Sequence, residues 1–139
     1  MLVISFLIMY TVMYLNVDRG DHVFLSLTRT YMSLLMVTPM ALLMLLLMGK
    51  MYPSKKLNVG IALSGICIFV LALIFLRNQV FITDKQYMQA MIPHHSSAIL
   101  TSKHAKISDP EVKKLSESII ASQEREIEQM KSILERMNK

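Results

Sequence analysis

Residues 57–76 form a run of twenty residues without a charged side chain. At about 1.5 Å per residue, a helix of this length crosses the roughly 30 Å hydrocarbon core of a bilayer. Residues 31–48 form a second uncharged run, interrupted only by Pro39, which membrane helices tolerate. A third uncharged run covers residues 1–17. The sequence therefore predicts three transmembrane helices, at about 1–17, 31–48 and 57–76.

Charge divides the chain into two parts. Residues 1–82 carry eight acidic or basic side chains, and the remaining 57 residues carry seventeen. This split predicts a membrane domain over residues 1–82 and a soluble domain over residues 83–139. The soluble part has nine Lys or Arg residues against eight Asp or Glu residues. It lacks the basic excess of a nucleic-acid-binding domain, so no nucleic acid is expected among its partners.

The loops predict the orientation in the membrane. Lys50, Lys55 and Lys56 lie between the second and third runs, with no acidic residue among them. The positive-inside rule places this loop in the cytoplasm and the C-terminal domain on the extracytoplasmic side of the cell (inner) membrane. The run 1–17 lacks the basic start and the small-residue cleavage site of a secretory signal, so we expect it to be retained.

The C-terminal part predicts two helices. Thr83 and Gln86 form a capping-box pattern, which predicts a helix from about residue 84 to 107. Residues 108–111 combine a capping residue with an early proline and start a second helix that reaches about residue 138. Because the link is short, the two helices are expected to pack as an antiparallel hairpin. The whole chain is thus predicted to be all-α.

One arc of the first hairpin helix gathers thioethers and imidazoles. A short turn near residue 108 places unusual residues of the second helix opposite this arc, whereas His104 falls on the far side and is expected at the surface. Soft metals such as Cu(I) and Ag(I) prefer these donors. The candidate ligands are Met88, Met91, His94, His95 and Met130, with Gln123 and Glu126 as residues that orient them. Copper as Cu(I) is the expected cofactor.

The two histidines could also have a purely structural role, as residues at the edge of the core that bond to Gln123 and Glu126. Two familiar metal sites do not fit. The His-Glu-x-x-His motif of zinc proteases is absent. The first hairpin helix has no Glu for a di-iron carboxylate site. There is also no nucleophile–base pair or glycine-rich phosphate loop, so the chain is not expected to be an enzyme.

These residues also resemble a known family. The segments Met91-Ile-Pro93-His94-His95, residues 109–115 and residues 120–130 are similar to the ferritin-like domain of unknown function 305. The resemblance covers residues 84–137 and implies kinship with copper-binding, CopM-like proteins that act outside the cytoplasm. It implies the same metal ligands. Longer members carry two helical pairs, so the single pair here is expected to form half of a ferritin-like four-helix bundle.

The sequence thus favours a membrane-anchored, extracytoplasmic protein that binds Cu(I) or Ag(I) for copper tolerance, storage or delivery. A hairpin of about 55 residues buries too little apolar surface to be stable alone. We therefore expect, besides the lipid bilayer, a second copy in a homodimer or a larger membrane complex as partner. The alternative is an accessory or structural subunit of such a complex, with the hairpin as its interaction module.

Overall fold

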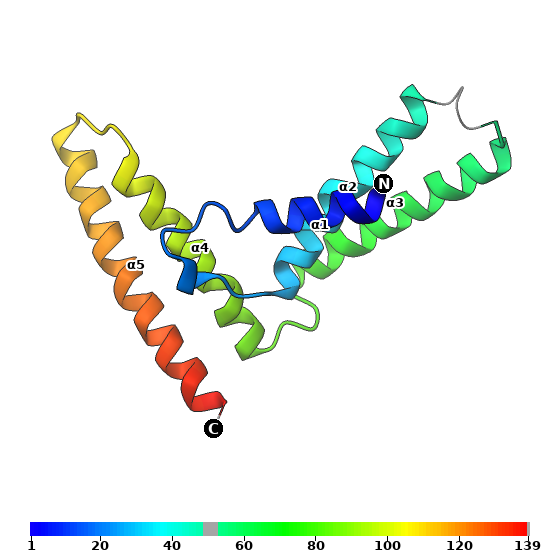
Figure 1. The fold of residues 1–139 in the computed structure, drawn as a ribbon. Coiled ribbons are helices and arrows are strands. Elements are labelled where there is room, and N and C mark those ends of the chain that lie inside the picture. The colour runs from blue at the N-terminus through cyan, green and yellow to red at the C-terminus, as the bar shows by residue number, and fades with distance from the viewer. Residues whose placement is uncertain (49–52, 139) are drawn as a thin grey trace. The chain divides into compact units, whose positions relative to one another are not determined.

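A computed structural model describes residues 1–48 and 53–138, and this part of the chain is all-helical, as predicted. Its elements are α1 (Leu2–Val12), the short 3-10 helix η1 (Gly20–His22), α2 (Leu27–Leu47), α3 (Lys55–Arg77), α4 (Asp84–His104) and α5 (Pro110–Met137) (Figure 1). The chain divides into two compact units. The first contains residues 1–12 and 27–81, and the second contains residues 13–26 and the part from Ile82 onward.

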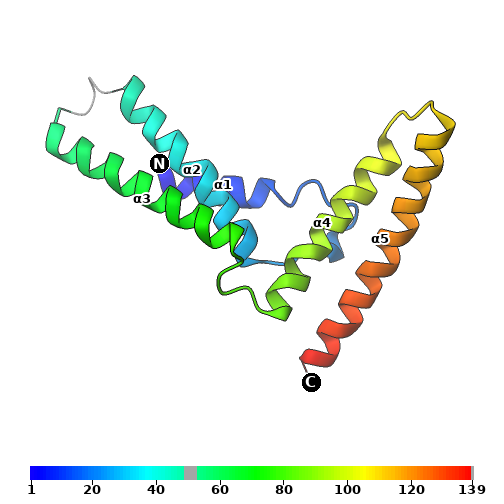
Figure 2. The same cartoon turned by 180° about the vertical axis from the view of Figure 1, so that it is seen from behind.

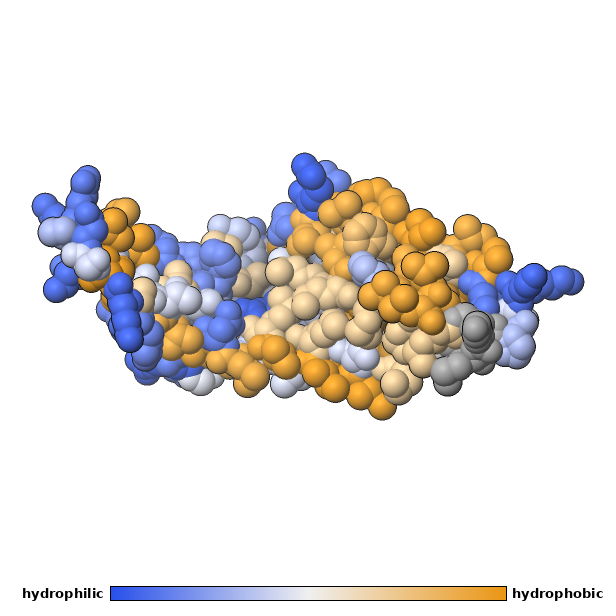
Figure 3. All heavy atoms as spheres, turned by 90° about the horizontal axis from the view of Figure 1, so that it is seen from above, coloured by the Kyte–Doolittle hydropathy of each residue, from blue (hydrophilic) through white to orange (hydrophobic). Residues whose placement is uncertain are grey.

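The first unit is built from α1, α2 and α3. The start of α2 meets the end of α3: the Tyr31 hydroxyl donates a 2.9 Å hydrogen bond to the Val80 carbonyl, and the Tyr31 ring packs edge-to-face on Phe75. α2 and α3 are both long and apolar enough to cross a membrane, and little of α3 is buried inside the protein. Hydrophobic side chains make up most of the visible surface of these helices (Figure 3). Large apolar surfaces of this kind mark sites that contact a membrane or another protein.

The first predicted span is shorter than expected. α1 contains eleven residues and ends at Val12, so it rises about 16 Å, roughly half of a bilayer core. The chain leaves the helix because its next residues find partners in the second unit. Tyr14 is buried there, and its hydroxyl donates a 2.8 Å hydrogen bond to the Phe24 carbonyl. The prediction of three full spans is therefore wrong, and two remain. Lys50 lies outside the described residues.

Gly65 of α3 lies close to Leu42 of α2, and the lack of a side chain on the glycine makes room for this contact. A Cβ atom on Gly65 would lie 3.3 Å from Cδ2 of Leu42, whereas a Cβ on Gly60 would meet nothing within 4 Å. We expect Gly65→Leu to overpack this contact and cost about 1–3 kcal/mol. The measurement is the thermal midpoint of the full chain in mild detergent, with Gly60→Leu as control. Equal midpoints for the two variants would contradict the packing described.

The second unit contains the antiparallel pair α4 and α5 (Figures 1 and 2). Both helices begin with side-chain caps: Thr83 accepts a hydrogen bond from the Gln86 amide, and Asp109 accepts from the amides of Glu111 and Val112. Lys85, at the start of α4, donates a 2.8 Å hydrogen bond to Asn138, just beyond α5. The buried core consists of Met88, Ile92, Ile99, Ile127 and Leu134, with Phe24 of the preceding loop packed against it.

The register of this pair differs from the expected one. A tight turn near residue 108 would place Gln123 and Glu126 level with residues 91–94. Instead the Glu126 carboxylate contacts the ring of His95, beyond that segment and further along α4. The reason is the link, which covers residues 105–109 and has extended backbone at both Ala105 and Asp109. An extended link lets α5 slide along α4.

Candidate metal site and the loop packed beside it

His95 is buried and bonded through both ring nitrogens. Its Nδ1 lies 2.9 Å from the Met91 carbonyl oxygen, and its Nε2 lies 2.7 Å from Oε2 of Glu126. Both partners are acceptors, so both hydrogen bonds form only when both nitrogens carry a proton. An imidazole in that state has no lone pair to offer a metal. His95 can serve as a ligand only after Nε2 gives up its proton and its contact with Glu126.

Glu126 is fixed from two sides. The Ser122 hydroxyl donates a 2.7 Å hydrogen bond to Oε1, opposite the contact with His95. The hydrogen bond from Ser122, followed by that from His95, lowers the pKa of the Glu126 carboxyl. The carboxylate is therefore ionised at neutral pH and holds the His95 ring in one orientation.

The neighbouring imidazole is open to solvent. His94 is exposed, and its ring centroid lies 6.0 Å from that of His95 with an angle of 66° between the planes. Adjacent residues on a helix normally point about 100° apart, yet these two rings remain neighbours at one edge of α4. His104 is exposed as expected, with Nδ1 2.9 Å from the Leu100 carbonyl oxygen.

Two of the candidate thioethers line one groove. Met88 is buried in the core of the pair, and Met130 is half-buried against it. Both line a groove of about 520 Å³ between α4 and α5, together with Tyr87, Ile133 and Met137. The structure thus divides the predicted ligands into thioethers in this groove and imidazoles further along α4.

Of the remaining candidates, Met91 lies between these two groups, whereas Gln123 lies beyond Glu126, about one turn closer to the link between the helices. Met91 is half-buried, and its carbonyl oxygen accepts the bond from His95. Oε1 of Gln123 is buried and has no hydrogen-bond partner within the described part of the chain. Across residues 1–48 and 53–138, no three His, Cys, Asp or Glu side chains are grouped so that they could hold a metal ion. The candidate ligands of this site are thioethers and imidazoles, with the Glu126 carboxylate beside His95.

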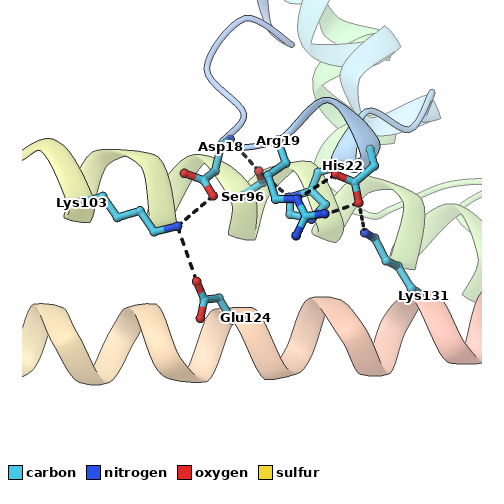
Figure 4. A network of polar contacts seen from close by, with 8 residues as sticks. Asp18, Arg19, His22, Ser96, Lys103, Glu124 and Lys131 are labelled. Atoms are coloured by element: carbon cyan, nitrogen blue, oxygen red, sulfur yellow. Dashed lines mark hydrogen bonds and ion pairs between the residues drawn. The ribbon is translucent and has the colours of Figure 1, made fainter.

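A second cluster of polar residues joins the loop 13–26 to α4, and sequence reasoning missed it. Ser96 is fully buried, and its Oγ accepts a 2.8 Å hydrogen bond from the Asp18 amide. The same Oγ lies 2.9 Å from Nδ1 of His22, which is also buried (Figure 4). In a neutral His22 whose proton is on Nε2, Nδ1 can accept the one proton that the Ser96 hydroxyl has to donate.

Ion pairs extend this cluster onto both helices. The Lys103 ammonium lies 3.0 Å from the Asp18 carboxylate on the loop and 3.5 Å from the Glu124 carboxylate on α5. Lys131 of α5 pairs with Asp21, and this hydrogen bond lowers the pKa of the Asp21 carboxyl to about 2. The loop is thereby fastened across the helix pair (Figure 4).

His22 is the titratable group at the centre of this cluster. Burial, reinforced by the positive charge of Lys131, lowers the pKa of its imidazole below 6.5. The residues around His22 in the sequence do not indicate this role, because the loop has no periodic pattern. The residue on α4 that the loop contacts, Ser96, lies more than seventy residues away in the sequence. A lone histidine beside Asp21 looks like a solvated loop residue until the partner helix is placed.

Comparison with known proteins places the chain in a family. Residues 77–139 match the family described as "Domain of unknown function (DUF305)". The chain is also similar to "Uncharacterized protein L153" of Acanthamoeba polyphaga mimivirus, with 43% identity over 113 residues that cover 80% of this chain and 72% of the viral protein. No solved structure matches the chain. The chain therefore belongs to the family of this viral protein, and its C-terminal part is a DUF305 domain.

Proposed function

We propose that this protein is a membrane-anchored, extracytoplasmic carrier of Cu(I), with Ag(I) as a substitute ion, that serves copper tolerance, storage or delivery. One observation carries the proposal: α4 and α5 bring the thioethers of Met88 and Met130 to one groove on the same helix pair as the imidazoles of His94 and His95. Thioether and imidazole together are the donors that a soft monovalent ion prefers.

The candidate ligands differ in what they require before they can bind the ion. Thioethers carry no proton, so Met88, Met91 and Met130 are ready ligands at any physiological pH. His94 offers an exposed imidazole, and His95 offers a second one after its Nε2 is deprotonated. Glu126 then supplies a negative charge beside the ion, and the contact of Nδ1 with the Met91 carbonyl oxygen keeps the His95 ring oriented. The metal is cargo here and takes part in no reaction.

The first unit supports the proposed anchoring and orientation. In this proposal α2 and α3 cross the membrane, and the first turn of α3, next to the link between the two helices, carries the exposed Lys55 and Lys56. Positive charge at this link favours the cytoplasmic side. With the start of α3 on the cytoplasmic side, its end lies on the other side of the membrane. The DUF305 part begins there, so the helix pair lies outside the cytoplasm and can bind copper before it enters the cell.

The test is an anaerobic titration of the full chain in mild detergent with Cu(I) against a competing chelator. We expect the protein to bind Cu(I) at least tenfold more tightly than the triple variant Met91→Ala, His94→Ala, His95→Ala, which lacks three candidate ligands. A tenfold difference in affinity corresponds to about 1.4 kcal/mol of binding free energy. His104→Ala is the matched control, because His104 is an exposed histidine of the same helix. Equal affinities for the protein and the triple variant would refute the proposal.

A second candidate function is that of an accessory subunit. The far end of the helix pair has a shallow apolar groove of about 290 Å³, lined by Ala105, Ile107, Val112, Leu115 and Ile119 among others. Leu115 is 60% exposed there, so a covering partner would bury apolar surface. Purification in mild detergent distinguishes the two functions: a stoichiometric partner favours the subunit, and metal without a partner favours the carrier.

A further inference from the structure

The groove that holds Met88 and Met130 contains a third thioether. Met137, at the end of α5, lines the same 520 Å³ groove and is 45% exposed. Met130 and Met137 are seven residues apart, so they lie on one face of α5, nearly two turns apart. Met88 comes from the facing helix. The groove therefore draws thioethers from both of its walls.

The register of the helices sets Met88 between the other two. Lys85 contacts Asn138, and His95 contacts Glu126. Interpolation between these contacts places Met88 level with residues 133–135 of α5. Met130 and Met137 then lie about one helical turn to either side, roughly 5 Å along the axis. A methionine side chain is long and flexible enough to cover that offset.

The walls of the groove suit a soft, weakly hydrated ion. Ile133 and the ring of Tyr87 line it, and Met88 is buried at its floor. Its charged lining residues, Asp84 and Arg136, have opposite signs and leave the groove without a strong net field. A hard divalent cation would find a single carboxylate there, whereas Cu(I) or Ag(I) would find three polarisable sulfur atoms.

We propose that Met137 is a further ligand of the carried ion and completes a three-thioether set with Met88 and Met130. This inference rests on the proposed function, since it names a residue of the same site. It assigns the end of α5 a binding role. It also makes the groove, with its uncharged donors, the part of the site whose occupation releases no proton.

Two measurements on the full chain in detergent test the inference. In the first, methionine methyl groups are labelled with ¹³C and followed by NMR during addition of Ag(I), which does not change oxidation state. The Met137 methyl resonance is assigned by its loss in Met137→Leu. We expect the methyl resonances of Met88, Met130 and Met137 to shift, while that of Met32, an exposed methionine of α2, stays in place.

In the second measurement, Cu(I) affinity is determined by chelator competition. Met137→Leu keeps the volume and apolar character of the side chain but removes the sulfur, so we expect affinity to fall at least tenfold and the thermal midpoint to stay unchanged. Met32→Leu is the matched control. An unmoved Met137 methyl overturns the inference whatever the affinity of Met137→Leu.

The outcomes separate this inference from the proposed function. If the protein binds Cu(I) more tightly than the Met91, His94, His95 triple variant but the Met137 methyl does not respond to Ag(I), only Met137 is excluded. If the protein fails to compete with the chelator and no methyl responds, the carrier function fails as well.

Discussion

Ile127→Ala is expected to destabilise the α4–α5 pair by about 2–5 kcal/mol, the usual cost of truncating a buried isoleucine. Ile127 is 1% exposed and belongs to the core that α4, α5 and the loop residue Phe24 share. Small helix pairs have few such residues, so one cavity removes a large part of their stability. The measurement is hydrogen exchange of the α4 and α5 amides in the full chain, which reports the free energy of opening this unit by itself.

Ile119 provides a matched control for this substitution. It lies on the same helix, but it is 37% exposed and lines the shallow groove at the far end of the pair. We expect Ile119→Ala to cost less than about 1 kcal/mol. If the two alanine variants opened with the same free energy, the core would lie elsewhere than described.

The attachment of the loop 13–26 is expected to weaken as the pH falls from 7 to 5. His22 is buried with a lowered pKa, so the unfastened loop binds a proton at a pH where the fastened loop does not. The contribution of His22 to the attachment of the loop is therefore fully present well above pH 6.5, the ordinary pKa of a histidine. This contribution is lost as the pH falls through 6.5 toward the lowered pKa of His22. Asp21 acts in a separate window: its pKa of about 2 leaves its contribution intact until the pH falls below about 4.

His22→Asn isolates the effect of the imidazole. The Oδ1 atom of asparagine takes the place of Nδ1 as an acceptor for the Ser96 hydroxyl, but the side chain does not titrate. The other charged groups around it, Asp18, Arg19, Asp21 and Lys131, are unchanged. The readout is hydrogen exchange of residues 13–26, corrected for intrinsic rates. A variant whose loop loosens between pH 7 and 5 as much as that of the native protein would rule out His22 as the cause.

Local patterns predicted the helices of this chain well. Thr83 and Gln86 form the predicted cap, and α4 and α5 begin within two residues of their expected positions. Such features depend on neighbouring residues, so the sequence contains them directly. The end of α1 could not be predicted in this way. Residues 13–17 carry no charge, as in the rest of the predicted span, but Tyr14 bonds to the Phe24 carbonyl and the helix ends before it.

The sequence predicted which residue types form the candidate site, but not which of them contact one another. The methionines and histidines fall on one side of α4 by helical periodicity alone. Their partners depend on the register with α5, which the extended link at residues 105–109 sets. That shift brings Glu126 to His95 and adds Met137 to the groove. His22 and Ser96 were missed because contacts between distant segments leave no local pattern.

The loop 13–26 makes the two units interleaved along the chain. It belongs to the second unit, yet both of its ends continue into helices of the first, so the backbone passes between the units three times. A single cut after α3 would not release the DUF305 part with all of its contacts. During synthesis the loop emerges long before α4 and α5, and its partners Ser96 and Lys131 follow 74 and 110 residues later. The second unit can therefore assemble fully only after nearly the whole chain has been made, which predicts slow completion of this part of the fold.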